Sequence, residues 1–131
     1  MPLHSHADFE DFFLVSGTQQ VLLPDAQGLH WRDARAGDYV RIPGGIPHAH
    51  RNVSGTPAVE LIITTARLGQ FFREAGRPVA AATQPPSPQE VARFVETASK
   101  YGYRLGTREQ NATVGIELPP LVDWPEAHTV G

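Results

Sequence analysis

The first residues with clear chemical potential form a short cluster near the start of the chain, His4-Ser-His6-Ala-Asp-Phe-Glu10. Side chains alternate between the two faces of a β-strand, so His4 and His6 share one face. Glu10 has the same parity and joins them if the strand continues with little distortion. Two imidazoles and a carboxylate suit the ligand chemistry of borderline divalent metal ions. The cluster therefore predicts part of a metal site.

A second cluster runs from Gly37 to Asn52 and contains the segment Pro43-Gly-Gly-Ile-Pro-His48. Proline followed by two glycines is typical of a tight turn that redirects the chain. We expect a new strand to begin at His48, directly after this turn.

Together the two clusters resemble the paired signatures of the cupin family, HxHx(3)Ex(6)G and Gx(5)PxGx(2)Hx(3)N. The first signature matches from His4 through Gly17, and the second from Gly37 through Asn52, without a gap. The resemblance implies that one divalent transition metal ion (Fe, Mn, Ni, Co, Cu or Zn) is held by four residues. These residues are His4, His6, Glu10 and His48.

The resemblance also implies an all-β fold, a cupin double-stranded β-helix or jelly-roll barrel with short C-terminal helices. In one respect the sequence departs from the family pattern, because the glycine that normally precedes the first histidine on an earlier strand is missing here. We expect that the true start lies upstream of Met1, or that a shortened barrel or a neighbouring subunit replaces the missing strands. An uncovered sheet edge of this kind predicts a homodimer.

Glycine and proline punctuate the short apolar runs that must build this barrel. We expect a cupin core over 1–65, a helical extension over 66–105 and an irregular tail over 106–131. The extension should hold a helix over 66–75, and a second over 88–101 that begins at the capping box Ser87-Pro-Gln-Glu90. The expected strands lie near 3–7, 9–15, 19–24, 29–33, 38–42, 48–53 and 57–64.

Several residues near the ligands are candidates for further roles. Glu10 is either a general base or only a ligand. His50 shares the parity of His48, and is either a contact to substrate or a histidine at the rim of the barrel. By alternation, four apolar residues either line a substrate cavity or simply fill the core. They are Phe12, Leu14, Leu61 and Ile63.

A weaker resemblance, from Gly69 to Leu105, links the layout of the extension to bacterial quercetin 2,3-dioxygenase-like cupins. It implies a metal-dependent dioxygenase that acts on a small aromatic or enolizable organic substrate. Two alternatives stay open. One is a non-redox isomerase or cyclase that uses the metal as a Lewis acid, and the other is a non-catalytic small-molecule binding protein.

Composition narrows the class of protein. A chain of 131 residues with a net charge of -3 predicts one domain and no basic face for nucleic acid. The absence of cysteine excludes disulfides and thiolate ligands. The sequence contains no membrane-spanning apolar run, so we expect a cytoplasmic protein with no membrane partner.

Overall fold

The computed structural model describes residues 1–81, 84–120 and 124–125. Short strands fill the first half of the chain, as the turn pattern predicts, and helices dominate the second half. The strands are β1 (His4–Ser5), β2 (Glu10–Ser16), β3 (Thr18–Asp25), β4 (Gly28–Arg35), β5 (Tyr39–Val40), β6 (Ala49–Arg51), β7 (Val59–Thr64) and β8 (Arg104–Leu105). The helices are α1 (Ala66–Ala75), α2 (Pro88–Lys100) and α3 (Arg108–Thr113), with a 3-10 turn over Val79–Ala81.

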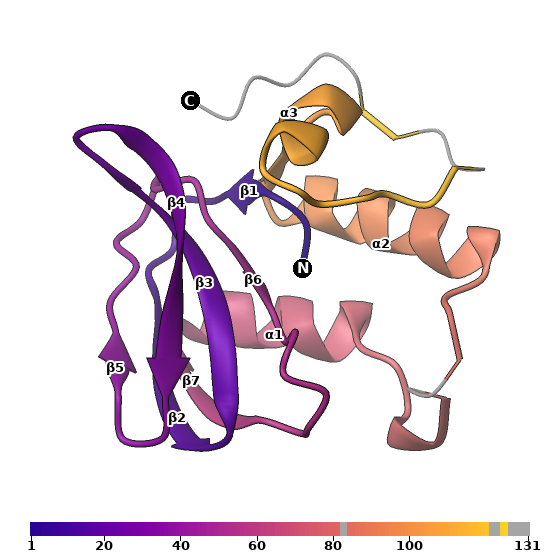
Figure 1. Ribbon diagram of the computed structural model, residues 1–131. Helices are drawn as coiled ribbons and strands as arrows, with labels where there is room; N and C mark the ends of the chain where they lie inside the picture. Colours follow the sequence, from indigo (N-terminus) through magenta and orange to yellow (C-terminus); the bar gives the residue numbers. More distant parts are fainter. Residues whose placement is uncertain (82–83, 121–123, 126–131) are drawn as a thin grey trace.

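Two three-stranded antiparallel sheets, ordered β5-β2-β7 and β4-β3-β6, form the main body (Figure 1). A buried cluster joins them, with Phe12 and Leu14 from β2 packed against Val21 and Ala34 from the other sheet. Within the described residues these strands form two separate sheets that pack face to face, so the main body is a β-sandwich.

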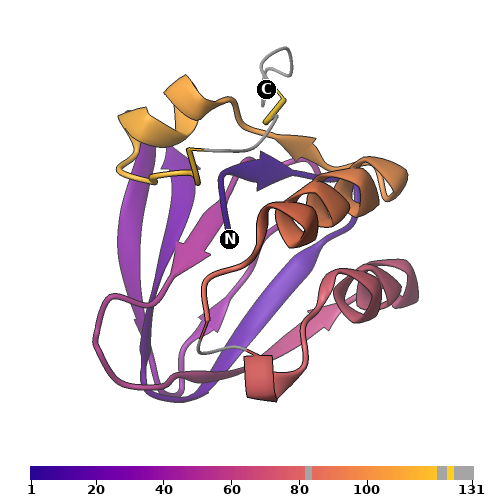
Figure 2. The ribbon, with the colours of Figure 1, turned by 90° about the vertical axis from the view of Figure 1, so that its right-hand side faces the viewer.

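Strand β1 carries the first histidine and lies outside both large sheets. It pairs antiparallel with β8, with His4 opposite Leu105 (Figure 2). On its other side, the backbone of His4 exchanges two hydrogen bonds with the backbone of His48, at 3.0 and 2.9 Å. The helical extension therefore supplies a strand that covers the strand of the first ligand.

Helices α1 and α2 begin at the predicted positions, residues 66 and 88, and pack against each other. Thr65 caps α1 by accepting a hydrogen bond from the backbone N–H of Leu68, and Ser87 and Glu90 form the expected capping box of α2. Leu68 and Phe71 of α1 are fully buried against α2 residues that include Val91. Burial of such side chains stabilises the fold by roughly 1.5–3 kcal/mol each.

The end of α2 is a Schellman motif that fixes the chain entering β8. Gly102 has a φ of +76°, a left-handed conformation that favours glycine. The N–H of Gly102 donates to the carbonyl of Ser99, and the N–H of Tyr103 donates to the carbonyl of Ala98. Tyr103 is thus placed at a defined point directly before β8.

The expected irregular tail over 106–131 is wrong in its first part, because α3 spans Arg108–Thr113. Thr107 and Gln110 form a capping box that starts this helix. Asn111 is fully buried, and its side-chain oxygen accepts a hydrogen bond of 2.9 Å from the backbone N–H of Leu3. Part of the expected tail, 121–123 and 126–131, lies outside the described residues.

Candidate metal centre

The four ligand residues implied by the sequence come together at one point. One ligand atom from each of His4, His6, Glu10 and His48 lies within 4.8 Å of all the others. All four side chains are buried, with exposed fractions between 0% and 4%. A cluster this compact and this buried fits a single metal ion.

Two local features hold the ligands in place. Glu10 is the first residue of β2, and its backbone N–H donates to the carbonyl of Ile42 at 2.9 Å. The turn at Gly44 and Gly45 packs directly on the segment after His6, whose carbonyl accepts a hydrogen bond of 2.7 Å from the N–H of Gly45. A Cβ atom on Gly44 would lie 2.1 Å from the carbonyl oxygen of Ala7, so only glycine fits this contact.

All three imidazoles are oriented by main-chain carbonyl groups. The Nδ1 atom of His4 lies 2.7 Å from the carbonyl oxygen of Pro2. The corresponding distances are 2.8 Å from His6 to Asp8 and 2.8 Å from His48 to Ile46. A carbonyl oxygen only accepts hydrogen bonds, so each Nδ1 carries a proton and Nε2 is the ring atom left to bind a metal.

The distances at the centre of the cluster also fit a bound cation. Oxygen Oε2 of Glu10 lies 2.9 Å from Nε2 of His6 and 3.2 Å from Nε2 of His48. These atoms carry lone pairs, so their close approach requires a proton or a metal ion between them. Ligand atoms about 2.1 Å from one metal are about 3 Å apart when they are adjacent, which matches both distances.

Two further atoms of the cluster have no hydrogen-bond partner among the described residues. They are Nε2 of His4 and Oε1 of Glu10, and both are buried. Unpaired buried polar atoms are rare in native proteins because their desolvation is costly. A metal ion at the common point would satisfy both, so the residues present fit a divalent cation.

The charge states suit a metal as well. Burial lowers the pKa of His4 well below its ordinary value, so this imidazole is neutral near pH 7. Burial acts to raise the pKa of Glu10, but hydrogen bonds with His48 and His6 outweigh it and hold that pKa well below its usual range. The site therefore combines an ionised carboxylate with a neutral imidazole ligand.

Tyr103 is a residue of this site that the sequence reasoning missed. Its ring stacks on His4, with centroids 5.2 Å apart and planes 18° apart, and lies 4.7 Å from the ring of His6. Burial and then the charge of Glu10 raise the pKa of Tyr103, so its hydroxyl keeps its proton. The one available signal was an aromatic residue directly after the helix-ending Gly102.

The remaining predicted site residues divide into two groups. Phe12 and Leu14 point inward and are 1% exposed, whereas Leu61 and Ile63 are 57% and 41% exposed. The expectation that all four line the interior is wrong for Leu61 and Ile63. In the register with β2, Ile62 rather than Leu61 or Ile63 opposes Phe12, although Ile62 is itself 37% exposed.

His50 points into the molecule rather than to a rim. Its ring lies 5.0 Å from that of Phe12, and Nδ1 accepts a hydrogen bond of 2.9 Å from the side-chain amide of Gln19. Burial lowers the pKa of His50 to about 3. His50 is therefore a neutral, half-buried group beside the apolar interior.

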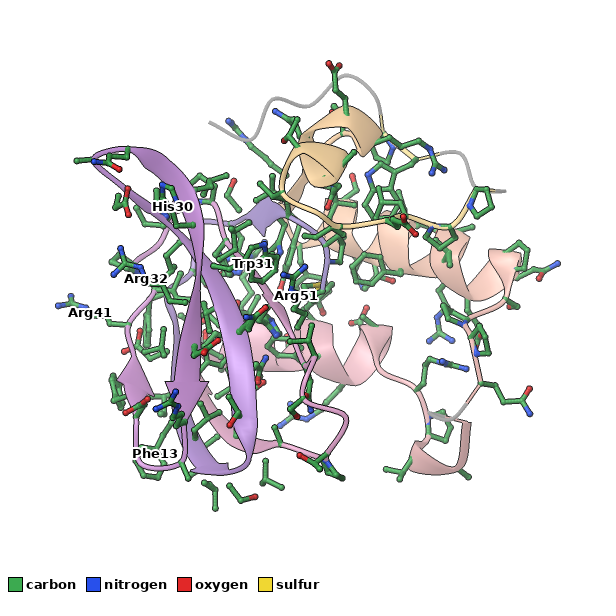
Figure 3. The ribbon with its side chains drawn as sticks, viewed as in Figure 1. Phe13, His30, Trp31, Arg32, Arg41 and Arg51 are labelled. Carbon is green, nitrogen blue, oxygen red and sulfur yellow. The ribbon has the colours of Figure 1, made fainter. Side chains whose placement is uncertain are left out.

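A pocket of about 630 Å³ lies between the β4-β3-β6 sheet and the helices. Its lining includes Trp31, His50, Arg51, Phe94 and Trp124 but none of the metal ligands. Figure 3 shows Trp31 and Arg51 side by side, and the guanidinium lies 3.8 Å from the centre of the indole ring. This volume is in the range of small-molecule sites.

Comparison with known proteins agrees with the resemblance of the two sequence clusters to the cupin signatures. Residues 1–64 match the family model described as a cupin domain. No curated protein sequence matches the chain. None of the helices in the described residues is both long enough and apolar enough to cross a bilayer.

Several solved structures are similar at low identity. An oxalate oxidase is 22% identical, with 75% of this chain and 57% of that chain covered and a TM-score of 0.43. The oxalate decarboxylase of Lactobacillus farciminis is 21% identical, with 95% and 39% covered and a TM-score of 0.45. That of Bacillus subtilis is 19% identical, with 98% and 34% covered and a TM-score of 0.45. This chain spans less than two thirds of the length of each.

Proposed function

With residues 1–64 taken as a cupin domain, we propose that this protein is a metal-dependent dioxygenase acting on a small aromatic or enolizable organic substrate. The observation that supports it most is the convergence of His4, His6, Glu10 and His48 on one buried point. A divalent transition metal held there supplies Lewis acidity and, if redox-active, electron transfer with dioxygen.

In this proposal the residues of the chain bind and orient the substrate. A substrate enol or phenol oxygen faces the ligand cluster, and the carboxylate of Glu10 receives the hydroxyl proton. Phe12 and Leu14 exclude water from the interior beside it, and His50 offers its buried Nε2 as a donor to the substrate. Dioxygen is the co-reactant, and both of its atoms enter the product.

The first test is whether the protein carries a metal. Elemental analysis of protein purified without chelator should find about one divalent transition ion per chain. His48→Ala should lose it, because one of the four ligands is removed. His30→Ala is the matched control, since His30 lies on exposed β4 with its Nε2 3.6 Å from Asp25. Retention of metal by His48→Ala would contradict the site.

The second test separates the proposed oxygenase from the two alternatives. Turnover of a flavonol or other enolizable compound should consume dioxygen and should stop under anaerobic conditions. Turnover that persists without dioxygen would indicate a non-redox isomerase or cyclase. Tight binding of a candidate compound to the metal-loaded protein without conversion would indicate a binding protein.

We also infer that the protein is a homodimer, joined through the outward face of the β5-β2-β7 sheet. Several large apolar side chains are exposed on this face, as at surfaces that bind other proteins. They are Phe13, Val15, Tyr39, Val59, Leu61 and Ile63. The face is apolar on its own, so a second copy related by a two-fold axis presents a matching surface. The expected cytoplasmic location stays a prediction, which cell fractionation can test.

A further inference from the structure

The phenol of Tyr103 is enclosed by the metal centre on one side and by α1 on the other. Its ring lies 4.2 Å from that of Phe71, in addition to its contacts with His4 and His6. The residue is 6% exposed. The Schellman motif at Gly102 and the pairing of β8 with β1 fix its backbone on both sides.

The hydroxyl of Tyr103 has no hydrogen-bond partner among the described residues and is fully buried. It shares this property with Nε2 of His4 and Oε1 of Glu10 in the same cluster. The last two are metal ligands, so a cation satisfies them. The hydroxyl is a donor, and a donor next to a cation needs an acceptor that the described part of the chain does not provide.

We propose that the Tyr103 hydroxyl donates a hydrogen bond to the oxygen atom that occupies the exchangeable coordination position of the metal. The ligand class is an anionic oxygen, such as a carboxylate, an enolate or a phenolate. This inference rests on the metal site of the proposed function. It assigns Tyr103, which lies beyond the segment matched by the cupin model, to the binding of the exchangeable ligand.

Simple packing does not account for the hydroxyl. Phenylalanine at this position would make the same ring contacts with His4, His6 and Phe71 without leaving a buried donor unpaired. By comparison, the hydroxyl of Tyr101 on the same segment is paired, because it donates to Glu74 at 2.6 Å. The two tyrosines therefore form a matched pair, with Tyr101 outside the centre and Tyr103 against it.

The experiment uses Co(II)-loaded protein and acetate as the probe ligand, followed by the visible absorption of the cobalt. Acetate should bind to the native protein and change the cobalt spectrum. Tyr103→Phe should weaken acetate binding about 10-fold while the affinity for Co(II) changes little. Tyr101→Phe should bind both as the native protein does.

Three results would overturn the inference. The first is acetate binding by Tyr103→Phe with native affinity, and the second is a native cobalt spectrum that acetate does not change. The third is a parallel loss of Co(II) affinity, which would make Tyr103 a support for the metal itself. Failure of the native protein to bind Co(II) would instead overturn the metal site of the proposed function, and it is visible before acetate is added.

A second measurement tests the inference in the native protein, in case the Tyr103→Phe variant does not fold. The chain has 3 tyrosines, so carbon-13 labelling at Cζ gives a simple spectrum of the native Zn(II)-loaded protein. Tyr39→Phe and Tyr101→Phe assign the Tyr103 signal by elimination. Acetate should shift the Tyr103 signal and leave the other two in place. A Tyr103 signal that acetate does not move would contradict the hydrogen bond.

Discussion

At the scale of single residues, Glu10 is a buried carboxylate that needs a positively charged partner. It is fully buried, and Oε2 approaches two imidazole nitrogens while Oε1 has no partner among the described residues. Without a cation, a carboxylate in this position depends on protons shared with His6 and His48. With a divalent cation, the same geometry becomes a set of metal bonds.

Glu10→Gln should lower metal affinity by more than the ~10–100-fold that changes beyond the direct ligands cost, because it removes the one anionic ligand among the described residues. The measurement is a competition titration with a chromogenic chelator. Asp33→Asn, an equal change of charge at an exposed position on β4, should keep native affinity. Native affinity in Glu10→Gln would exclude Glu10 as a ligand.

A second residue-scale prediction concerns Gly44. Gly44→Ala should destabilise the fold and weaken metal binding, because its Cβ would lie 2.1 Å from the carbonyl oxygen of Ala7 and would push the His48 turn away from His6. Gly69→Ala is the contrasting change within α1, because a Cβ atom on Gly69 would have no other atom within 4 Å. It should raise the free energy of unfolding by about 0.5–1 kcal/mol. Thermal melts of both variants, with and without metal, test the pair.

At the scale of elements, β1 depends on segments that are far away in the sequence. It has only two residues, His4–Ser5, yet it is bonded to β8 on one side and to His48 on the other. The buried side chain of Asn111 in α3 adds a hydrogen bond to Leu3, directly before β1. The first ligand is therefore positioned by the C-terminal extension.

Asn111→Ala should lower the free energy of unfolding by ~1–3 kcal/mol, since it leaves the N–H of Leu3 without a side-chain partner in the interior. It should also weaken metal binding, because His4 follows Leu3 directly. Thr113→Ala, an exposed change in the same helix, serves as the control. Chemical denaturation and the same chelator competition would measure both effects. Unchanged metal affinity in a destabilised Asn111→Ala would show that β1 holds its place without α3.

The elements also show what the sequence alone could predict. Local signals located the strands of the first half, α1 and α2, because alternation, turn glycines and the capping box at Ser87 act within a few residues. The four ligands were implied by the resemblance of the clusters around His4 and His48 to the cupin signatures, and they do converge. Strand β8 and Tyr103 were missed, because two residues carry no periodicity and their role depends on a distant partner, β1. The inward parity of β7 depends on its register with β2, which composition does not encode.

At the scale of the whole molecule, the two faces of the β5-β2-β7 sheet differ in their surroundings. The inner face packs on the other sheet around Phe12 and Leu14, while the outer face leaves Phe13, Tyr39 and Leu61 exposed. Exposed apolar clusters of this kind usually mark an interface. The candidate metal centre therefore lies on the inner side of β2, and the proposed dimer interface lies on its outer side.

Leu61→Glu should convert the proposed dimer to a monomer, because it places a charge at the centre of the apolar outer face. Light scattering coupled to size-exclusion chromatography measures the mass. Val53→Glu, at a residue 64% exposed outside this face, should remain a dimer. A monomeric native protein, or a dimeric Leu61→Glu, would contradict the proposed interface.

The orientation of the three imidazoles has a consequence for how this protein tolerates change. Each Nδ1 proton is held by a main-chain carbonyl, at Pro2, Asp8 or Ile46. A substitution at one of these positions changes the side chain but keeps the carbonyl. Point mutations at those three positions leave the tautomer of every ligand intact as long as the backbone path is kept. Substitutions can therefore accumulate at these three positions without changing which nitrogen of each imidazole faces Glu10.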